Sequence, residues 1–264
     1  MRSEHPVIVR KVLAVFRALA RGFFRLDVRG LEHIPAHGGA LIAGNHPSVL
    51  DGILLLLLVE RPVRFLVAED MYNHHFLRPL FRLMGAIPVY RTRESNGDAL
   101  RAAVEALEGG QVIGIFPEST TAYEGTLPQV RRGVALLALK TGVPVVPLSI
   151  RGTAESFPSG AAAPAPGVVR FQFYAPIRYV RMAVDPIPEP VVSTALTDIH
   201  GELLQRLAET PRVIKGEATA WSGMKRAQAA LCGVIVVPLA RMLTATANPS
   251  LDPVRLRAAL GRLS

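Results

Sequence analysis

The chain has 264 residues, half of them hydrophobic, and a formal net charge of +9. This length suits one large α/β domain with short additions, and the excess of basic residues favours anionic partners such as lipid, nucleic acid or acidic carriers. Aromatic residues make up only 6% and do not interleave with basic clusters, which argues against single-strand nucleic-acid binding. The one cysteine, Cys232, lies in an apolar run and excludes a disulfide framework.

Residues 6–26 predict an amphipathic helix. This pattern is typical of a basic helix lying in a membrane surface, which we prefer to the alternative of a helix docked on the protein core. Charged residues interrupt the apolar ones, so neither a cleaved secretory signal nor a spanning helix is predicted. We expect residues 1–25 to associate with the cytoplasmic face of the cell membrane, as a peripheral or monotopic element. The apolar face comprises Val9, Val12, Val15, Phe16, Leu19 and Phe23, and the basic face Arg10, Arg17, Arg21 and Arg25.

From residue 26 the pattern changes to alternating strands and helices. Strands are expected at 26–30, 40–43, 63–67, 86–90, 112–116, 143–150 (broken by Pro144 and Pro147) and 168–174, and helices at 52–60, 76–84, 97–107, 133–141 and 193–209. This alternation predicts an α/β fold with a central, largely parallel sheet flanked by helices. Five leucines at 54–58 predict burial on all sides or contact with lipid. We treat 26–212 as one domain and 213–264 as a helical segment that either contacts a membrane or docks on the domain.

A histidine and an aspartate follow the expected strand 40–43. His46 lies in the turn before Pro47, where a helix begins, and such strand ends are the usual ligand positions of open α/β sheets. Asp51 can contact Nδ1 only because His46 stays outside the helix, which leaves Nε2 as a general base. The helix N-terminus disfavours added positive charge and favours a neutral imidazole. The alternative is structural: a histidine that caps the helix and an aspartate that neutralises it.

Other charged residues follow neighbouring expected strands. Glu118 ends the strand 112–116 and is expected to point toward His46; the alternative is a turn carboxylate held by backbone N–H groups. Arg91 follows the strand 86–90, and Arg131 and Arg132 precede a helix N-terminus. Guanidinium groups at these positions suit a phosphate clamp, although solvated basic loops are the alternative. The histidine spacings predict no metal site.

These segments resemble the conserved blocks of the glycerolipid acyltransferases, the lysophosphatidate acyltransferase group. The order and spacing of four blocks agree, and the likeness covers about residues 26–180. The blocks are His46-Pro47-Ser48-Val49-Leu50-Asp51, Gly85-Ala86-Ile87-Pro88-Val89-Tyr90-Arg91, Phe116-Pro117-Glu118-Ser119-Thr120 and Val143-Pro144-Val145-Val146-Pro147.

The resemblance implies transfer of a fatty acyl group from acyl-CoA or acyl-carrier protein to the hydroxyl of a lysolipid in phospholipid biosynthesis, with no metal or organic cofactor. It implies that His46 is the base, that Asp51 is its partner, and that Arg91 and Glu118 bind the acceptor. Ser119 and Thr120 of the third block, together with Arg131 and Arg132, complete the expected acceptor site. The fourth block is expected near the donor and the oxyanion.

Two departures from the family pattern concern the acceptor. Ser119 replaces the usual glycine, and Thr121 stands where members that form phosphatidate usually carry arginine. Arg93, Arg131 or Arg132 could supply the missing cation, and lysophosphatidate is then the acceptor. Otherwise the acceptor lacks a phosphomonoester, as in lyso-ornithine lipids or glycolipids. Alternatives of another kind are a thioester hydrolase, a non-catalytic lipid-binding membrane protein and, on charge alone, a nucleic-acid-binding protein.

Overall fold

The computed structural model describes residues 7–73, 78–90, 96–118, 130–158, 161 and 164–213. Within them, the strands form one sheet in the order β1-β7-β6-β2-β5-β3-β4. The strands β6, β2, β5, β3 and β4 are parallel to one another, whereas β7 and β1 run the opposite way. The predicted largely parallel sheet is therefore confirmed. The strands are β1 (Arg25–Arg29), β2 (Ala40–Gly44), β3 (Val63–Ala68), β4 (Ile87–Val89), β5 (Val112–Ile115), β6 (Val145–Arg151) and β7 (Val168–Phe173).

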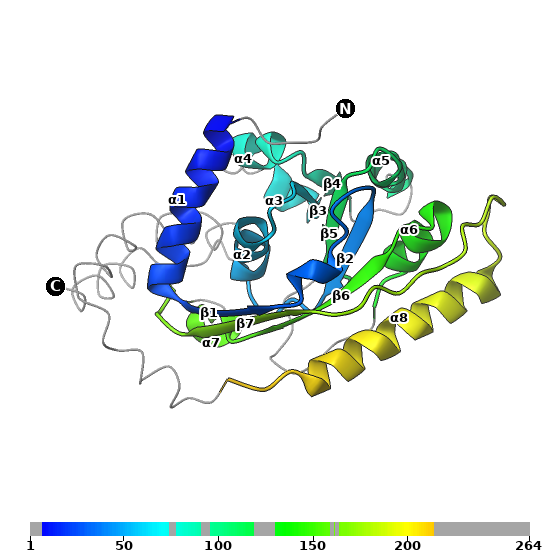
Figure 1. Ribbon diagram of the computed structural model, residues 1–264. Coiled ribbons are helices and arrows are strands. Elements are labelled where there is room, and N and C mark those ends of the chain that lie inside the picture. The colour runs from blue at the N-terminus through cyan, green and yellow to red at the C-terminus, as the bar shows by residue number, and fades with distance from the viewer. Residues whose placement is uncertain are drawn as a thin grey trace.

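Helices cover both faces of this sheet (Figure 1). The buried side chains of α1 and α2 belong to the core on one face, and those of α5, α6 and α8 belong to the core on the other. The result is a three-layer arrangement in which the sheet is hidden from water on both sides, as parallel sheets require. The helices are α1 (Val7–Phe23), α2 (Leu50–Leu58), α3 (Glu69–Tyr72), α4 (Arg78–Leu83), α5 (Asn96–Glu108), α6 (Gly133–Thr141), α7 (Thr153–Ser156) and α8 (Glu189–Glu209), with a short 3-10 helix, η1 (Leu31–His33).

The central strand β2 and its neighbour β5 determine where His46 and Glu118 lie. All five of its residues are buried, and it pairs with β6 on one side and β5 on the other. Its last pair with β5 is Ala43 with Ile115. His46 follows Ala43 by three residues and Glu118 follows Ile115 by three residues, so both lie just beyond the carboxyl ends of these neighbouring strands. Two segments more than sixty residues apart in the sequence thus meet beyond one edge of the sheet.

The leucine-rich helix α2 is buried in the protein. Leu54, Leu55, Leu57 and Leu58 are all in the core, and Leu56 is half-buried against it. Four of the five leucines are therefore interior residues, and the face that carries Leu56 remains partly exposed. A continuous apolar run in a short helix fits this position because α2 lies between the sheet and α1.

The first helix docks on the protein with the face that carries Phe16, Leu19 and Phe23. Val15 was expected on that face but is 58% exposed, because one residue turns a helix by about 100°. Arg17, expected on the basic face, is half-buried and donates from Nε to the carbonyl oxygen of Leu57 at 2.5 Å. A cation at the last turn of α2 is favourable to that helix dipole. The side chains of residues 7–12 lie outside the described part.

Two predicted boundaries are wrong for reasons that involve proline. The helix α8 begins at Glu189, four residues before the expected start, because Pro190 fits the first helical turn, where no N–H is needed. Pro147 does not break β6 but lies within it, opposite Ala43 of β2. Its carbonyl still accepts the N–H of Tyr174 at 2.9 Å.

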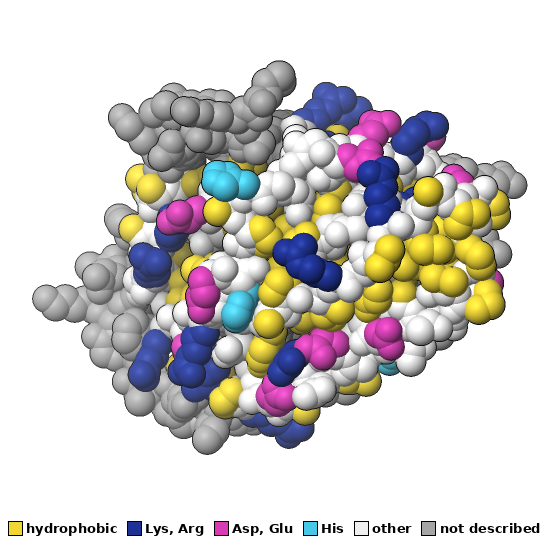
Figure 2. All heavy atoms as spheres, turned by 45° about the vertical axis from the view of Figure 1, so that its right-hand side comes forward, with side chains coloured by type: hydrophobic (Ala, Val, Ile, Leu, Met, Phe, Trp, Pro, Cys, Tyr) yellow, Lys and Arg dark blue, Asp and Glu magenta, His cyan; other side chains and the backbone are white. Residues whose placement is uncertain are grey.

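In the described ranges, no helix is both long enough and apolar enough to cross a bilayer. Figure 2 views the molecule from the side on which α5 and α6 lie, where hydrophobic side chains form a continuous area between charges of both signs. The expected C-terminal segment falls almost entirely outside the described residues, since only Val213 of it is described.

Candidate active site

His46 and Asp51 are in direct contact at the end of β2. The Nδ1 atom of His46 lies 2.8 Å from Oδ2 of Asp51. The His46 side chain is 22% exposed and that of Asp51 is fully buried. Beside an ionised carboxylate, Nδ1 must carry the hydrogen, which leaves the lone pair on Nε2. The predicted contact between these two side chains is present.

The start of α2 holds Asp51 in place. The N–H of Ser48 donates to the same Oδ2 atom at 2.8 Å, and Oγ of Ser48 accepts the N–H of Leu50 at 3.4 Å. These reciprocal bonds satisfy N–H groups that a helix start leaves without partners. Asp51 is therefore both a helix-start residue and the partner of His46, so the structural and the catalytic interpretations of this pair are compatible.

Phe116 covers one side of the His46 ring. The two ring centroids are 4.2 Å apart and the planes differ by 7°, which is a face-to-face stack. Phe116 is in turn 6.2 Å from the ring of Phe65, with the planes 13° apart. Phe116 was expected only as part of the third block, with no role of its own. It directly follows β5, so its place beside His46 depends on the register of β2 and β5.

Glu118 lies buried in the turn after β5, only 5% exposed. Burial raises its pKa to about 7, and the negative charge of Asp51 adds to this rise, whereas the backbone N–H of His46 opposes it. Within the described residues, no group lies in hydrogen-bonding geometry with either carboxylate oxygen of Glu118 or with Oδ1 of Asp51. Glu118 therefore stands beside the His46–Asp51 pair, as expected, in a setting that disfavours its charge.

Two side chains beside His46 tie the turn to β6 and to the segment that follows it. The amide of Asn45 donates to the carbonyl of Ile150 at 2.9 Å and accepts the N–H of Ile150 at 2.7 Å. Oγ of Ser48 donates to the carbonyl of Phe157 at 3.1 Å. Since both residues are buried, these bonds are shielded from water. Sequence reasoning missed Asn45, because its partner lies 105 residues away.

The predicted arginines divide into two groups. Arg131 and Arg132 are exposed at the start of α6, and the backbone N–H of Arg131 donates to the carbonyl of Pro117, next to Glu118. Arg132 pairs with Glu189 of α8 at 2.5 Å, an interaction that the sequence did not indicate. Arg91, Ser119 and Thr120 lie outside the described residues, as do Arg93 and Thr121.

The fourth block forms the strand beside β2. Val145 and Val146 are completely buried, and Pro147 lies opposite Ala43, three residues before His46. The described part of this block is therefore interior packing that supports the turn of His46.

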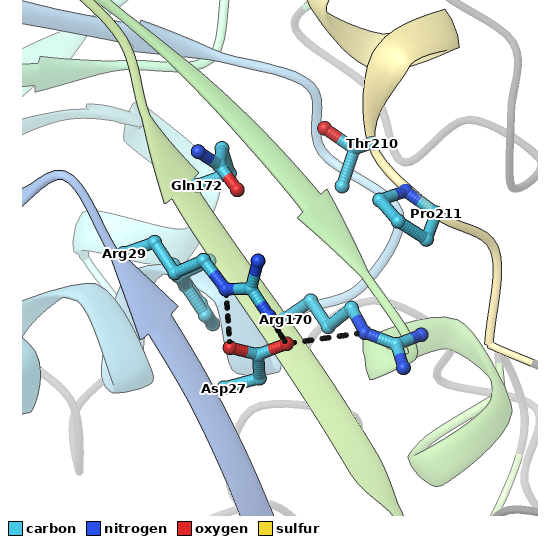
Figure 3. A pocket seen from close by; sticks show the side chains of 7 residues that line it. Asp27, Arg29, Arg170, Gln172, Thr210 and Pro211 are labelled. Carbon is cyan, nitrogen blue, oxygen red and sulfur yellow. Dashed lines mark hydrogen bonds and ion pairs between the residues drawn. The ribbon is translucent and has the colours of Figure 1, made fainter.

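A hollow of about 90 Å³ lies away from His46, where β1 pairs with β7 (Figure 3). Asp27 lies between two arginines there, 2.9 Å from Arg29 and 3.4 Å from Arg170. The charged side chains that line the hollow therefore pair with one another. Among the described side chains, no three His, Cys, Asp or Glu residues come together in a way that could hold a metal ion.

Comparison with known proteins gives a consistent result. Residues 25–151 match the family model described as Acyltransferase. The chain is 31% identical over 141 residues to the chloroplastic 1-acyl-sn-glycerol-3-phosphate acyltransferase BAT2 of Brassica napus, a match that covers 53% of this chain and 41% of that protein. It is 28% identical over 134 residues to the 1-acyl-sn-glycerol-3-phosphate acyltransferase of Borreliella burgdorferi, covering 50% of this chain and 54% of that one.

A solved structure is also similar. The 1-acyl-sn-glycerophosphate acyltransferase PlsC from Thermotoga maritima superposes with a TM-score of 0.59 at 26% identity, covering 77% of this chain and 81% of that one. The matches to the curated relatives are shorter, spanning about half their length or less. The region that the family model matches, residues 25–151, contains both His46 and Glu118.

Proposed function

Because residues 25–151 match the Acyltransferase family model and the solved PlsC structure is similar, we propose that the chain is an O-acyltransferase that moves a fatty acyl group from a thioester donor to lysophosphatidate, giving phosphatidate. The observation that carries this proposal is the imidazole of His46. Its Nδ1 is held 2.8 Å from Asp51, and in the described structure no hydrogen bond occupies Nε2. The acceptor follows from the similar proteins, which are named as 1-acyl-sn-glycerol-3-phosphate acyltransferases.

In the proposed reaction, Nε2 of His46 takes the proton from the acceptor hydroxyl as its oxygen attacks the thioester carbonyl carbon. Asp51 stabilises the imidazolium that forms. The tetrahedral intermediate collapses, the carbon–sulfur bond breaks, and the leaving thiolate takes the proton from His46. Backbone N–H groups at the start of α2 or near the fourth block stabilise the oxyanion, each contributing about 3 kcal/mol.

For the acceptor, we propose that Glu118, Arg91, Ser119 and Thr120 contact its headgroup. Arg131 is the better candidate for an additional phosphate ligand, since Arg132 already pairs with Glu189. The donor is acyl-CoA or acyl-carrier protein. We place the enzyme at the cytoplasmic face of the membrane that supplies its acceptor, with α1 and the net positive charge as the contacts.

The test combines purified protein, an acyl-CoA and a panel of lysolipids, with thiol release and the lipid products measured together. Lysophosphatidate should be consumed and phosphatidate formed, and His46→Ala should show no transfer while it remains folded. Full activity of a folded His46→Ala enzyme would remove the mechanism. Thiol release without any acceptor would indicate a hydrolase, and its complete absence with every lipid would indicate a binding protein.

A second acceptor class follows from Thr121, which stands where arginine is usual in phosphatidate-forming members. A lyso-ornithine lipid and a lysoglycolipid therefore belong in the same panel. Preference for either of them over lysophosphatidate would transfer the assignment to an acceptor without a phosphomonoester.

A further inference from the structure

The geometry points to Phe116 as a positioning residue for His46, an inference that rests on the proposed function of His46 as the base. The phenyl ring lies parallel to the imidazole at a centroid distance of 4.2 Å. Asp51 contacts the edge of the same imidazole at Nδ1. One contact fixes the edge of the ring and the other fixes its plane, so together they determine the direction in which Nε2 points.

The carboxylate alone does not determine that direction. A single hydrogen bond to Nδ1 tolerates a broad range of rotation of the ring about the bond. Terminal torsions of histidine are also broad rather than confined to sharp minima. A flat surface against one face of the imidazole removes most of this freedom. Productive proton transfer requires Nε2 within hydrogen-bond reach of the acceptor oxygen, so a narrower range of orientations raises the reactive fraction.

Neighbouring residues hold the phenyl ring in turn. The ring of Phe65 of β3 lies 6.2 Å from it, centroid to centroid, with the ring planes 13° apart. Gly114 of β5 leaves the space that Phe65 uses, because a Cβ atom there would come within 2.6 Å of the Phe65 ring. Gly52 of α2 faces Phe116, whose Cε2 atom would lie 3.9 Å from an added Cβ. The Phe65–Phe116–His46 stack is therefore built from three different segments of the fold.

The stack also favours the transition state. As His46 takes the proton from the acceptor it becomes a cation, and the face of a phenyl ring attracts positive charge within about 6 Å. This attraction is absent while the imidazole is neutral, so it lowers the barrier without strengthening substrate binding. If Phe116 only filled space, any apolar side chain of similar size could replace it without loss of kcat. A positioning Phe116 requires an aromatic face.

The test compares Phe116→Leu, Phe116→Met and Phe116→Tyr in the full chain. The two aliphatic variants should lower kcat about tenfold, with KM for the lysolipid changed by less than about twofold, which corresponds to lost transition-state stabilisation. Phe116→Tyr keeps the aromatic face and should retain at least about half of kcat. Phe24→Leu is the matched control, because it makes the same change in a buried phenyl whose aromatic neighbour is Phe23. It should lower thermal stability with little change in kcat.

A spectroscopic measurement separates this inference from the proposed function. In the wild-type protein, ring current from Phe116 should shift the His46 imidazole proton resonances upfield, and the shift should disappear in Phe116→Leu or Phe116→Met and persist in Phe116→Tyr. This readout needs no activity, so an inactive wild-type enzyme would overturn the proposed function alone. Unchanged imidazole resonances, or aliphatic variants with wild-type kcat, would overturn the role of Phe116. If Phe116→Leu fails to fold, Phe116→Met carries the same comparison.

Discussion

Glu118 lies where a negative charge is poorly solvated, since its carboxylate is buried beside Asp51. Its pKa of about 7 exceeds the ordinary value of 4.5, so between these values the folded protein binds more protons than the unfolded chain. The free energy of unfolding therefore falls as the pH rises from about 4.5 to about 7, and this loss is complete above pH 7. Glu118 thus destabilises the fold at physiological pH, as residues held for function often do.

Replacing Glu118 by glutamine should remove that loss. Glutamine resembles the protonated carboxyl, so Glu118→Gln should match the wild type near pH 4.5 and exceed its stability by about 2–3 kcal/mol at pH 8. Urea unfolding across this pH range measures the difference. Parallel stability curves for the two proteins would contradict the raised pKa.

Asp51 is expected to act on the reaction more than on binding. In Asp51→Asn the side chain can still accept the N–H of Ser48, but it no longer carries the charge that stabilises an imidazolium. The value of kcat should fall by about 10²-fold or more, while KM for the lysolipid changes little. Steady-state kinetics on protein with an unchanged circular dichroism spectrum provide the measurement. Equal losses of affinity and turnover would instead indicate a disrupted site.

At the scale of single residues, the sequence predicts the contact between His46 and Asp51 but not the residues that surround this pair. His46 and Asp51 are only five residues apart and share one turn, so local geometry brings them together. Phe116 and Asn45 owe their contacts to strand pairing with segments 70 and 105 residues away along the chain. Such contacts depend on strand order and register, which no local pattern specifies.

Arg61 shows how one residue can join several elements at the edge of the sheet opposite the site. Its guanidinium group donates to the carbonyl oxygens of Pro35, Gly38 and Gly110 at 2.5, 2.7 and 2.7 Å. The first two precede β2 and the third precedes β5, the two strands that carry the site residues. The planar, multidentate geometry of arginine suits this role, whereas an ammonium group cannot reach all three oxygens.

Removing this clamp should weaken the fold without changing the chemistry. Arg61→Met keeps much of the apolar stem but leaves three carbonyl groups without their donors, and we expect a loss of about 2–3 kcal/mol. Arg61→Lys should recover part of it. Chemical denaturation measures these values, and kcat under folding conditions should stay near that of the wild type. A loss below about 0.5 kcal/mol would show that water replaces the guanidinium at little cost.

Uninterrupted apolar elements follow the sequence pattern closely, and single-turn elements do not. Both β2 and α6 have the expected positions because each is an uninterrupted apolar segment. The single-turn elements α3, α7 and η1 have no detectable periodicity and were not expected. The start of α7 depends on Gly152, whose φ of +86° would strain any other residue. The backbone of Val168 also lies close to Gly152, since a Cβ atom added at Gly152 would lie 2.0 Å from the carbonyl oxygen of Val168.

For the whole molecule, the charge of +9 and the helix α1 predict binding to anionic bilayers. The full chain should bind vesicles that contain an anionic phospholipid, and raising the salt from about 50 to 500 mM should reduce that binding at least about tenfold. Vesicle flotation provides the measurement. His46→Ala serves as the control, because its binding should equal that of the wild type. Equal affinity for uncharged vesicles would show that charge is not the attraction.

Composition and alternation were enough to predict three layers around a mostly parallel sheet, because each central strand is a short apolar run followed by a helix. They did not predict that β7 and β1 reverse direction at one edge. The alternating pattern of Val168–Phe173 is compatible with either direction, and the choice depends on packing across the whole sheet.

The pairing of β1 with β7 has a consequence for biosynthesis. Asp27 and Arg170, which bond across this pair, are 143 residues apart. On a ribosome that releases the chain from its N-terminus, β1 has no neighbouring strand until β7, about 140 residues further along the chain, has been made. During that interval the nascent α1 has no finished domain to rest on. A nearby bilayer is then its first available apolar surface, so insertion into the lipid can precede completion of the catalytic domain.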